Sequence, residues 1–318
     1  MTEHYVTLFD QAFLPQGLAL YTSLTKFASP FRLWVLCLDQ DTFDFLRSHN
    51  FPHLTPISLT DYETPTLKQL SFERSPVEYC WTLTPFSILW ALQIDPSIDR
   101  VTYLDADVFF LADPKPLFDD FSSSSCSVLI TEHDYSPKCD QTANSGRYCV
   151  QFLTIKRGEG ETVLNWWCER CIEWCYARYE DGRFGDQSYL AGFVQYFPNQ
   201  TFVLKGNGRL LAPWNADYYR YSDAILYHFH GLRVSNANFI LASKDRVLPP
   251  VRLHIYDPYV RLLQSLIAEY ELAWIRPQIS LSFKLRFKRS LALIASFFAV
   301  FLGRMSSTSL FYVSPVRR

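Results

Sequence analysis

Residues 101–110 read VTYLDADVFF, an apolar strand pattern followed by two aspartates and a second apolar run. If the backbone stays extended, Asp105 and Asp107 point to the same side, because side chains alternate along a strand. Hard divalent cations such as Mg2+ and Mn2+ prefer oxygen ligands, usually one or two carboxylates with water and phosphate. The stretch therefore predicts a Mg2+ or Mn2+ site at the carboxyl end of a strand, where open α/β sheets bind their ligands.

The chain contains a second Asp-x-Asp, Asp39-Gln40-Asp41, at the end of another apolar strand pattern. Spacing alone does not distinguish the two pairs, but the residues that follow do. Residues 42–46 continue as a helix, so we expect Asp39 and Asp41 to be its solvated amino-terminal cap. Residues 108–111 instead form an apolar run typical of a strand, which a simple polar turn does not need. The pair Asp105 and Asp107 is therefore the preferred cation site.

Strand and helix patterns alternate along the rest of the chain. Strands are expected at residues 5–9, 31–38, 54–59, 101–104, 127–131, 148–155, 201–204 and 224–229, with a loop after 59. Helices are expected at residues 15–27, from 39–41 onward, and at 80–92, 161–179, 186–193 and 259–274. This alternation predicts an α/β fold with a mostly parallel sheet covered on both faces. Pro249-Pro250 marks a boundary between a domain at residues 1–250 and a helical extension at 251–318.

Composition and charge exclude several classes of protein. Of 318 residues, 48% are hydrophobic and 19% are charged, which excludes long intrinsic disorder. The net charge of -2 does not suggest a nucleic-acid partner. The amino terminus lacks the basic and apolar regions of a signal peptide, so we expect a cytoplasmic protein. Eight cysteines are then expected to be thiols, and spacing places Cys168, Cys171 and Cys175 on one packed helical face rather than at a metal site.

Charge is distributed unevenly. Residues 276–318 hold eight of the 30 basic residues and no acid, which leaves a net charge of -10 on residues 1–275. A basic segment at 284–289 precedes an apolar stretch at 291–302, about twelve residues long and too short to span a bilayer. This pattern is typical of an interfacial helix on an anionic membrane surface. The alternative is a helix that packs on the body or on another subunit.

Several segments, in the same order, resemble GT-A-fold nucleotide-sugar glycosyltransferases, especially family 8, which includes glycogenin and bacterial lipopolysaccharide glycosyltransferases. The matching segments, over roughly residues 5–235, are Val6-Thr7-Leu8-Phe9-Asp10, Leu18-Ala19-Leu20-Tyr21-Thr22-Ser23-Leu24, Tyr103-Leu104-Asp105-Ala106-Asp107-Val108, Phe184-Gly185-Asp186-Gln187-Ser188-Tyr189-Leu190 and His228-Phe229-His230-Gly231. The resemblance implies a Rossmann-like GT-A fold and a retaining transferase that binds a nucleotide sugar, commonly a UDP-sugar, through Mn2+ or Mg2+.

The resemblance also implies a role for individual residues. Asp105 and Asp107 would bind the metal, with His228 as the third protein ligand and His230 as its competitor, since both histidines lie on one side of a strand. Asp10 would face the base or ribose of the nucleotide, with Thr7 as a weaker candidate.

Asp186 would contact donor-sugar hydroxyls and Gln187 would lie beside the reacting carbon. An amide is a poor nucleophile, which favours front-face displacement over a covalent intermediate. Asp186 could also cap the helix that follows it.

The chain departs from the family 8 pattern at two places. Tyr148-Cys149-Val150-Gln151-Phe152 replaces an Asn-Ala-Gly or Asn-Ser-Gly turn, so the specificity for the donor sugar is left open. The His-x-x-Gly motif stops without its Lys-Pro-Trp continuation, and Arg233 or Lys205 could supply the missing positive charge to the diphosphate.

The sequence thus predicts a metal-dependent glycosyltransferase acting on a cell-envelope glycan or lipid-linked saccharide at the cytoplasmic face of the inner membrane. Two alternatives remain. An inverting enzyme would need a carboxylate base, for which Asp217 and Glu132 are conceivable. A catalytically inactive sugar-binding or scaffold protein would explain the altered segment around Cys149.

Overall fold

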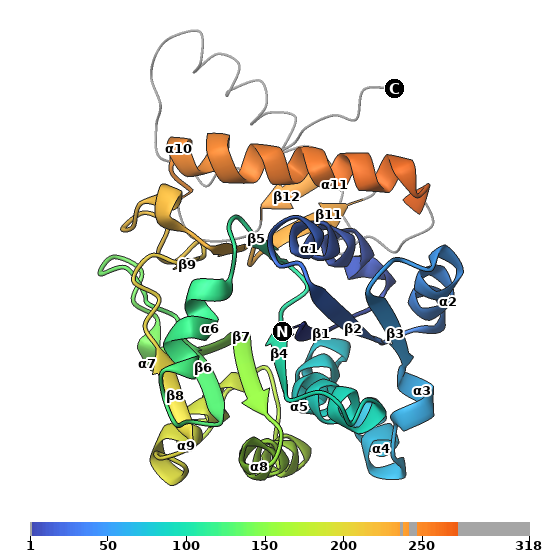
Figure 1. Cartoon of the computed structure of the whole chain (residues 1–318), viewed down its shortest axis with the longest axis vertical. Coiled ribbons are helices and arrows are strands. Elements are labelled where there is room, and N and C mark those ends of the chain that lie inside the picture. Colours follow the sequence, from blue (N-terminus) through green and yellow to red (C-terminus); the bar gives the residue numbers. More distant parts are fainter. Residues whose placement is uncertain (1, 236–237, 242–246, 273–318) are drawn as a thin grey trace, which may run out of the picture.

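A computed structural model describes residues 2–235, 238–241 and 247–272. Its main sheet has seven strands in the order β3-β2-β1-β4-β7-β6-β8 (Figure 1). These strands are β1 Glu3–Phe9, β2 Phe31–Cys37, β3 Leu54–Ser58, β4 Arg100–Leu104, β6 Val128–Glu132, β7 Tyr148–Lys156 and β8 Thr201–Leu204. Strand β7 runs antiparallel to both neighbours, and the other pairs are parallel. The predicted mostly parallel α/β sheet is confirmed.

Two smaller sheets lie beside the main one. Strands β5 Val108–Phe110, β10 Leu226–His228 and β9 Leu210–Leu211 form one of them, in the order β5-β10-β9. Strands β11 Leu232–Ser235 and β12 Asn238–Leu241 form an antiparallel pair. The apolar run after Asp107 is therefore a strand, as its sequence predicts.

Helices cover both faces of the main sheet (Figure 1). They are α1 Leu14–Phe27, α2 Gln40–His49, α3 Leu59–Tyr62, α4 Pro65–Glu73, α5 Pro76–Ile94, α6 Lys115–Ser122, α7 Thr142–Ser145, α8 Glu159–Glu173, α9 Leu190–Tyr196, α10 Pro249–Val251 and α11 Asp257–Glu269. Short 3-10 turns lie at Gln11–Phe13, Gln187–Tyr189 and Tyr221–Asp223, and a π-helical turn at Arg252–Tyr256 joins α10 to α11. The loop expected after residue 59 contains α3 and α4.

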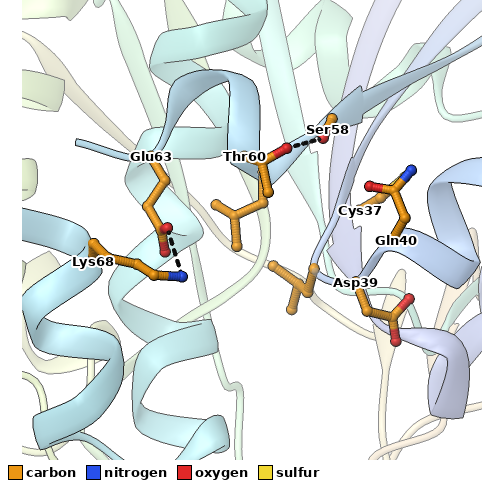
Figure 2. A pocket seen from close by; sticks show the side chains of 9 residues that line it. Cys37, Asp39, Gln40, Ser58, Thr60, Glu63 and Lys68 are labelled. Atoms are coloured by element: carbon orange, nitrogen blue, oxygen red, sulfur yellow. Dashed lines mark hydrogen bonds and ion pairs between the residues drawn. The ribbon is translucent and has the colours of Figure 1, made fainter. Parts of the chain in front are cut away.

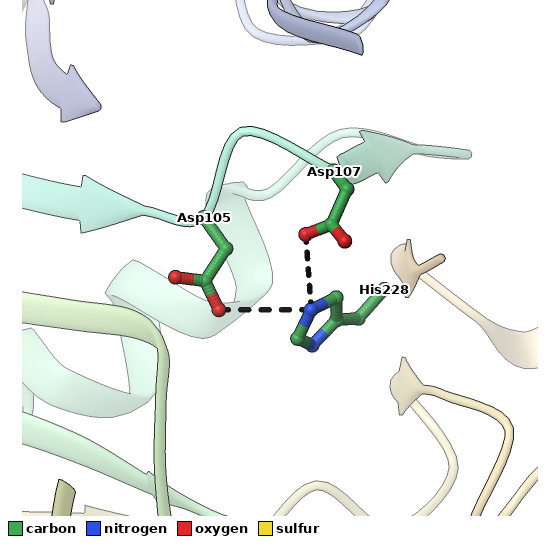
Figure 3. A group of neighbouring side chains, drawn as sticks. All are labelled: Asp105, Asp107 and His228. Atoms are coloured by element: carbon green, nitrogen blue, oxygen red, sulfur yellow. Dashed lines mark ion pairs between the residues drawn. The ribbon is translucent and has the colours of Figure 1, made fainter. Parts of the chain in front are cut away.

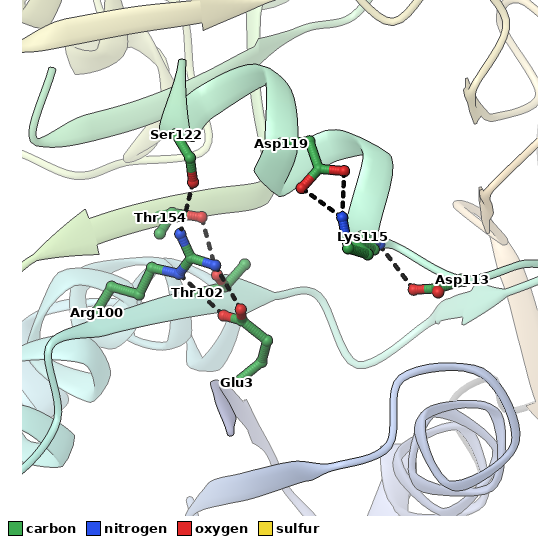
Figure 4. Close-up of polar contacts among 8 residues, drawn as sticks. All are labelled: Glu3, Arg100, Thr102, Asp113, Lys115, Asp119, Ser122 and Thr154. Carbon is green, nitrogen blue, oxygen red and sulfur yellow. Dashed lines mark hydrogen bonds and ion pairs between the residues drawn. The ribbon is translucent and has the colours of Figure 1, made fainter. Parts of the chain in front are cut away.

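Two hydrophobic cores explain why the strands read as continuous apolar runs. Along β1, Tyr5 and Phe9 are buried in the core beneath α1, while Val6 and Leu8 are buried in the core beneath α5. A strand between two layers of helices has no solvent-facing side, so its sequence does not alternate between apolar and polar residues. Polar contacts between strands are few and specific. Thr102 of β4 hydrogen-bonds to Thr154 of β7 at 2.8 Å, and Arg100 forms an ion pair with Glu3 of β1 (Figure 4).

Helix α8 ends earlier than predicted. It stops at Glu173, and Trp174 is already extended, so Cys175 does not share a helical face with Cys168 and Cys171. Arg74 explains the early end, because its guanidinium donates to the carbonyls of Cys171 and Ile172 in the last turn. All three thiols are nevertheless buried, as expected of packed cysteines.

Buried side chains between Val251 and Leu272 pack against the rest of the described chain. Helix α11 lies against α1, and its buried side chains belong to the same core as Tyr5 and Phe9. In the described part of the chain, no helix has the length and apolar character needed to cross a membrane. The basic segment at 284–289, the apolar stretch at 291–302 and the end of the helix predicted at 259–274 lie outside the described residues.

Candidate functional site

Asp105, Asp107 and His228 converge at the carboxyl end of β4. Figure 3 shows both carboxylates directed at the imidazole, whose Nε2 is 3.1 Å from Asp107 Oδ1 and 3.6 Å from Asp105 Oδ2. One ligand atom from each residue lies within 4.8 Å of the others. The backbone turns at residues 106–107 rather than staying extended, because the Val108 N–H donates to the Asp105 carbonyl. This turn, not strand alternation, brings the two carboxylates together.

Strand pairing brings the histidine to the aspartates. Strand β10 lies antiparallel to β5, and His228 at the end of β10 pairs with Val108, the residue after Asp107. The Phe229 N–H also donates to the Asp107 carbonyl at 2.8 Å. Backbone hydrogen bonds therefore join two segments that are 120 residues apart in the chain.

The electrostatics of the three residues fit a cation. Burial raises the pKa of Asp107, but the positive charge of His228 outweighs burial and holds this pKa well below its usual range. Burial likewise lowers the pKa of His228, but Asp107 raises it well above the usual value. Burial raises the pKa of Asp105. The Nε2 proton of His228 lies between the two carboxylates, where an ion held by all three side chains would lie, and metal binding would displace this proton. Two oxygen donors and one imidazole suit Mg2+ or Mn2+.

Asp186 faces the same region from the turn before α9. Its side chain is buried, and burial together with the negative charge of Asp105 raises its pKa to about 7. Its Oδ2 has no hydrogen-bond partner among the described residues. The prediction that Asp186 caps the following helix is wrong, because its backbone is already helical and its side chain makes no cap bond. This one oxygen is therefore available to a ligand hydroxyl.

Asp10 belongs to the same group of carboxylates. It follows β1, and its side chain accepts from the Ala12 N–H at 3.0 Å. Burial raises the pKa of the Cys80 thiol, and the charges of Asp186, Asp10 and Asp105 raise it further, so all three carboxylates act on the same thiol. Thr7, earlier on β1, is fully buried, and its hydroxyl has no partner among the described residues.

Two residues at the site were missed as contributors. Gln151 of β7 places its Oε1 2.8 Å from Nδ1 of His228, and both side chains are buried. Cys149, on the same strand, lies beside His133 and His228, which lower its pKa to about 7 despite the opposing effect of burial. The sequence showed them only as a departure from a glycine-containing turn. No local pattern reveals a contact between residues 77 positions apart.

The chain is similar in sequence to two proteins of Bacillus subtilis (strain 168). No protein-family profile matches it. The uncharacterized protein YfnF of Bacillus subtilis (strain 168) is 32% identical over 260 residues, which cover 76% of this chain and 85% of YfnF. The chain belongs to the YfnF family. YfnD, an uncharacterized protein of the same organism, is 28% identical over 290 residues, covering 86% of this chain and 92% of YfnD.

The fold of this YfnF-family chain also occurs in solved structures. The apo-form glycosyltransferase GlyE of Streptococcus pneumoniae TIGR4 matches with a TM-score of 0.51 and 15% identity. The match covers 87% of this chain and 65% of GlyE. The galactosyltransferase LgtC matches 90% of this chain with a TM-score of 0.46 and 14% identity. The GlyE likeness confirms the predicted GT-A fold.

The remaining predicted residues lie at different distances from Asp105, Asp107 and His228. His230 is exposed and its ring centroid lies 5.4 Å from that of His228, but it is not in the group whose ligand atoms converge. The charge of Arg233 helps to lower the pKa of Asp107, so this guanidinium is near the site. Lys205 is exposed in the loop after β8, and among the described residues it makes no side-chain contact with Asp105, Asp107 or His228.

The second Asp-x-Asp is a helix cap, as predicted. Asp39 accepts from the Thr42 N–H at 2.9 Å and also from the Gln11 N–H at 3.0 Å. It also lines a cavity of about 140 Å³ at the carboxyl ends of β2 and β3 (Figure 2). Cys37, Ser58, Thr60, Glu63 and Lys68 are among the other lining residues. The cavity opens at the same sheet edge as Asp10 and Asp105.

A second hollow, of about 290 Å³, lies beyond the ends of β6 and β7. Its lining includes Glu132, Asp134, Tyr135 and Arg147. Glu132 forms an ion pair with Arg147 at 2.8 Å. Gln187 is linked to the segment that borders this hollow, because its Nε2 donates to the Ser145 carbonyl at 2.9 Å.

Proposed function

We propose that this YfnF-family protein is a metal-dependent, retaining glycosyltransferase that uses a UDP-sugar donor and a cell-envelope glycan or lipid-linked saccharide acceptor. The observation that carries the proposal is the convergence of Asp105, Asp107 and His228 at the ligand-binding edge of a GT-A sheet. The resemblance of the sequence motifs to family 8 supports the choice of donor and of retention.

In this proposal, Asp105, Asp107 and His228 hold Mn2+ or Mg2+. The cation, when bound, would neutralise the negative charge that develops on the diphosphate leaving group. The nucleoside of the donor would lie at the carboxyl ends of β1 and β2, next to Asp10 and to the cavity that Asp39 lines. Arg233 adds a positive charge on the same side as Asp107. We assign no role to Lys205 beyond that of a loop cation.

Asp186 and Gln187 would act on the donor sugar. Asp186 has an unpartnered carboxylate oxygen in a buried setting, which can accept a hydrogen bond from a sugar hydroxyl. Gln187 is oriented by its bond to Ser145. An amide beside the reacting carbon does not form a covalent sugar adduct, so the acceptor hydroxyl would attack from the face that the diphosphate leaves.

The test is UDP binding and donor turnover with and without Mn2+, measured by isothermal titration calorimetry and by a hydrolysis assay over a panel of UDP-sugars. We expect UDP to bind far more tightly with Mn2+. Asp107→Asn should abolish this Mn2+ effect and lower turnover by orders of magnitude, because the ion loses a charged ligand. Asp41→Asn is the matched control from the other Asp-x-Asp, and should behave as the wild type.

Three results would change the assignment. Near-normal turnover of Asp107→Asn at saturating donor would refute the metal site. Binding of UDP without turnover of any donor would indicate an inactive nucleotide-sugar-binding protein. An inverted anomeric centre in the first-formed product, read by proton NMR, would replace retention with inversion and direct attention to Glu132 and Asp217 as bases.

A further inference from the structure

Gln151 makes a buried contact with the back of the histidine ligand. It lies on β7, next to Phe152, which pairs with Leu104, the residue before Asp105. Gln151 is 1% exposed and His228 is 4% exposed, so water does not compete for the bond between Oε1 and Nδ1. The bond length of 2.8 Å is that of a well-formed hydrogen bond.

The chemistry of this bond selects one form of the imidazole. A neutral imidazole carries a single N–H, and an amide oxygen can only accept. Once a metal displaces the Nε2 proton, the remaining proton must therefore be on Nδ1, which leaves the lone pair on Nε2 for the ion. Nε2 is the atom that lies 3.1 Å from Asp107 and 3.6 Å from Asp105. A metal ion needs that lone pair. If the amide of Gln151 were turned so that its NH2 group faced Nδ1 of His228, Nε2 of His228 would carry the hydrogen instead.

We propose that Gln151 is a positioning residue of the metal site, which holds the ring of His228 and selects the tautomer that binds the ion. This inference rests on the proposed metal site. Histidine ligands in proteins commonly donate their second N–H to a carbonyl or carboxylate, and this partner affects metal affinity. A neutral amide does so without adding a third negative charge beside Asp105 and Asp107. The Gln at this position is also where the chain departs from the glycine-containing turn of family 8.

The test measures Mn2+ affinity in the absence of any nucleotide, from the electron paramagnetic resonance signal of free Mn2+. Gln151→Leu has a similar size and no acceptor, and we expect it to weaken Mn2+ binding by about 10- to 100-fold. Gln151→Glu restores an acceptor and should bind Mn2+ at least as tightly as the wild type. Gln16→Leu is the matched control, because Gln16 is a fully buried glutamine on α1 whose amide has no partner among the described residues.

The outcomes separate this inference from the proposed function. Equal Mn2+ affinity of the wild type and Gln151→Leu would overturn the role of Gln151 and leave the metal site intact. A wild type that binds no Mn2+ would refute the metal site, and this inference with it.

A second measurement needs no variant and therefore decides the question even if Gln151→Leu does not fold. Long-range proton–nitrogen NMR spectra of the Mg2+-loaded wild type should show His228 protonated at Nδ1 and unprotonated at Nε2. A proton on Nε2, or an ion bound through Nδ1, would contradict the proposal.

Discussion

The carboxylates of the candidate site differ in their pKa although they lie close together. Asp107 has a direct ion pair with His228, which outweighs burial and lowers its pKa. No cation among the described residues pairs with Asp186, so burial dominates and raises its pKa to about 7. One acid is thus held ionised, while the other is half protonated near neutral pH. The difference suits one residue for binding a cation and the other for meeting a hydroxyl group.

The raised pKa of Asp186 predicts how stability changes with pH. Native Asp186 keeps its proton up to about pH 7, whereas the unfolded chain releases it near pH 4. The native state therefore binds more protons in this window, and the free energy of unfolding falls as pH rises from about 4 to 7. Asp186→Asn should remove this decrease, on the order of 3 kcal/mol. Urea unfolding of both proteins with EDTA present, at several pH values, measures the effect, and identical slopes would contradict it.

At the level of the elements, a long-range cap decides where α8 ends. Arg74 is buried directly after α4, and its guanidinium donates to the Cys171 carbonyl at 2.7 Å and to the Ile172 carbonyl at 2.6 Å. The last carbonyls of a helix have no partner within the helix. Periodicity alone predicts a helix to residue 179, because it takes no account of a side chain 97 positions away.

Removing this cap should destabilise the protein. Arg74→Met leaves two buried carbonyls without a donor, so we expect a loss on the order of 2–4 kcal/mol in the free energy of unfolding. Arg74→Lys should recover only part of it, because an ammonium lacks the planar fork that reaches both oxygens. Arg32→Met, at an exposed position on β2, is the control and should change stability by less than about 0.5 kcal/mol. A loss for Arg74→Met as small as that of the control would show that the cap is unimportant.

At the level of the whole molecule, residues 251–272 support the strand that carries His228. Tyr259 of α11 stacks on Phe229, with ring centroids 3.6 Å apart, and the Tyr256 hydroxyl accepts from that of Tyr227 at 3.2 Å. Tyr227 and Phe229 are the residues directly before and after His228 in the sequence. The division of the chain at residue 250 stays a prediction, but residues 251–272 share a core with the site.

The basic segment beyond this core leads to a prediction about membranes. We propose that residues 276–318 attach the protein to an anionic surface, since each basic residue near such a surface contributes about 1 kcal/mol. Truncation after Arg276 removes seven basic residues and leaves an acidic body. The full chain should co-sediment with phosphatidylglycerol vesicles and be released by salt, while the truncated chain stays in solution.

The truncated chain should keep the melting temperature and the Mn2+ affinity of the full protein, because the described core ends at Leu272. This is the control for folding. Co-sedimentation that truncation does not change would refute the membrane anchor.

Local sequence patterns were enough to predict the order and type of the strands around VTYLDADVFF, the cap at Asp39 and the acidic pair of the candidate metal site. These features depend on neighbours a few positions away, through side-chain alternation, helix periodicity and local hydrogen bonds. The choice of His228 over His230, the contact of Gln151 and the end of α8 at Arg74 were decided only by the tertiary structure. Each depends on pairing or packing between segments 77 or more positions apart in the chain. Contacts over such distances produce no periodic pattern of residues in the sequence, because periodicity reflects only neighbours within a helix or strand.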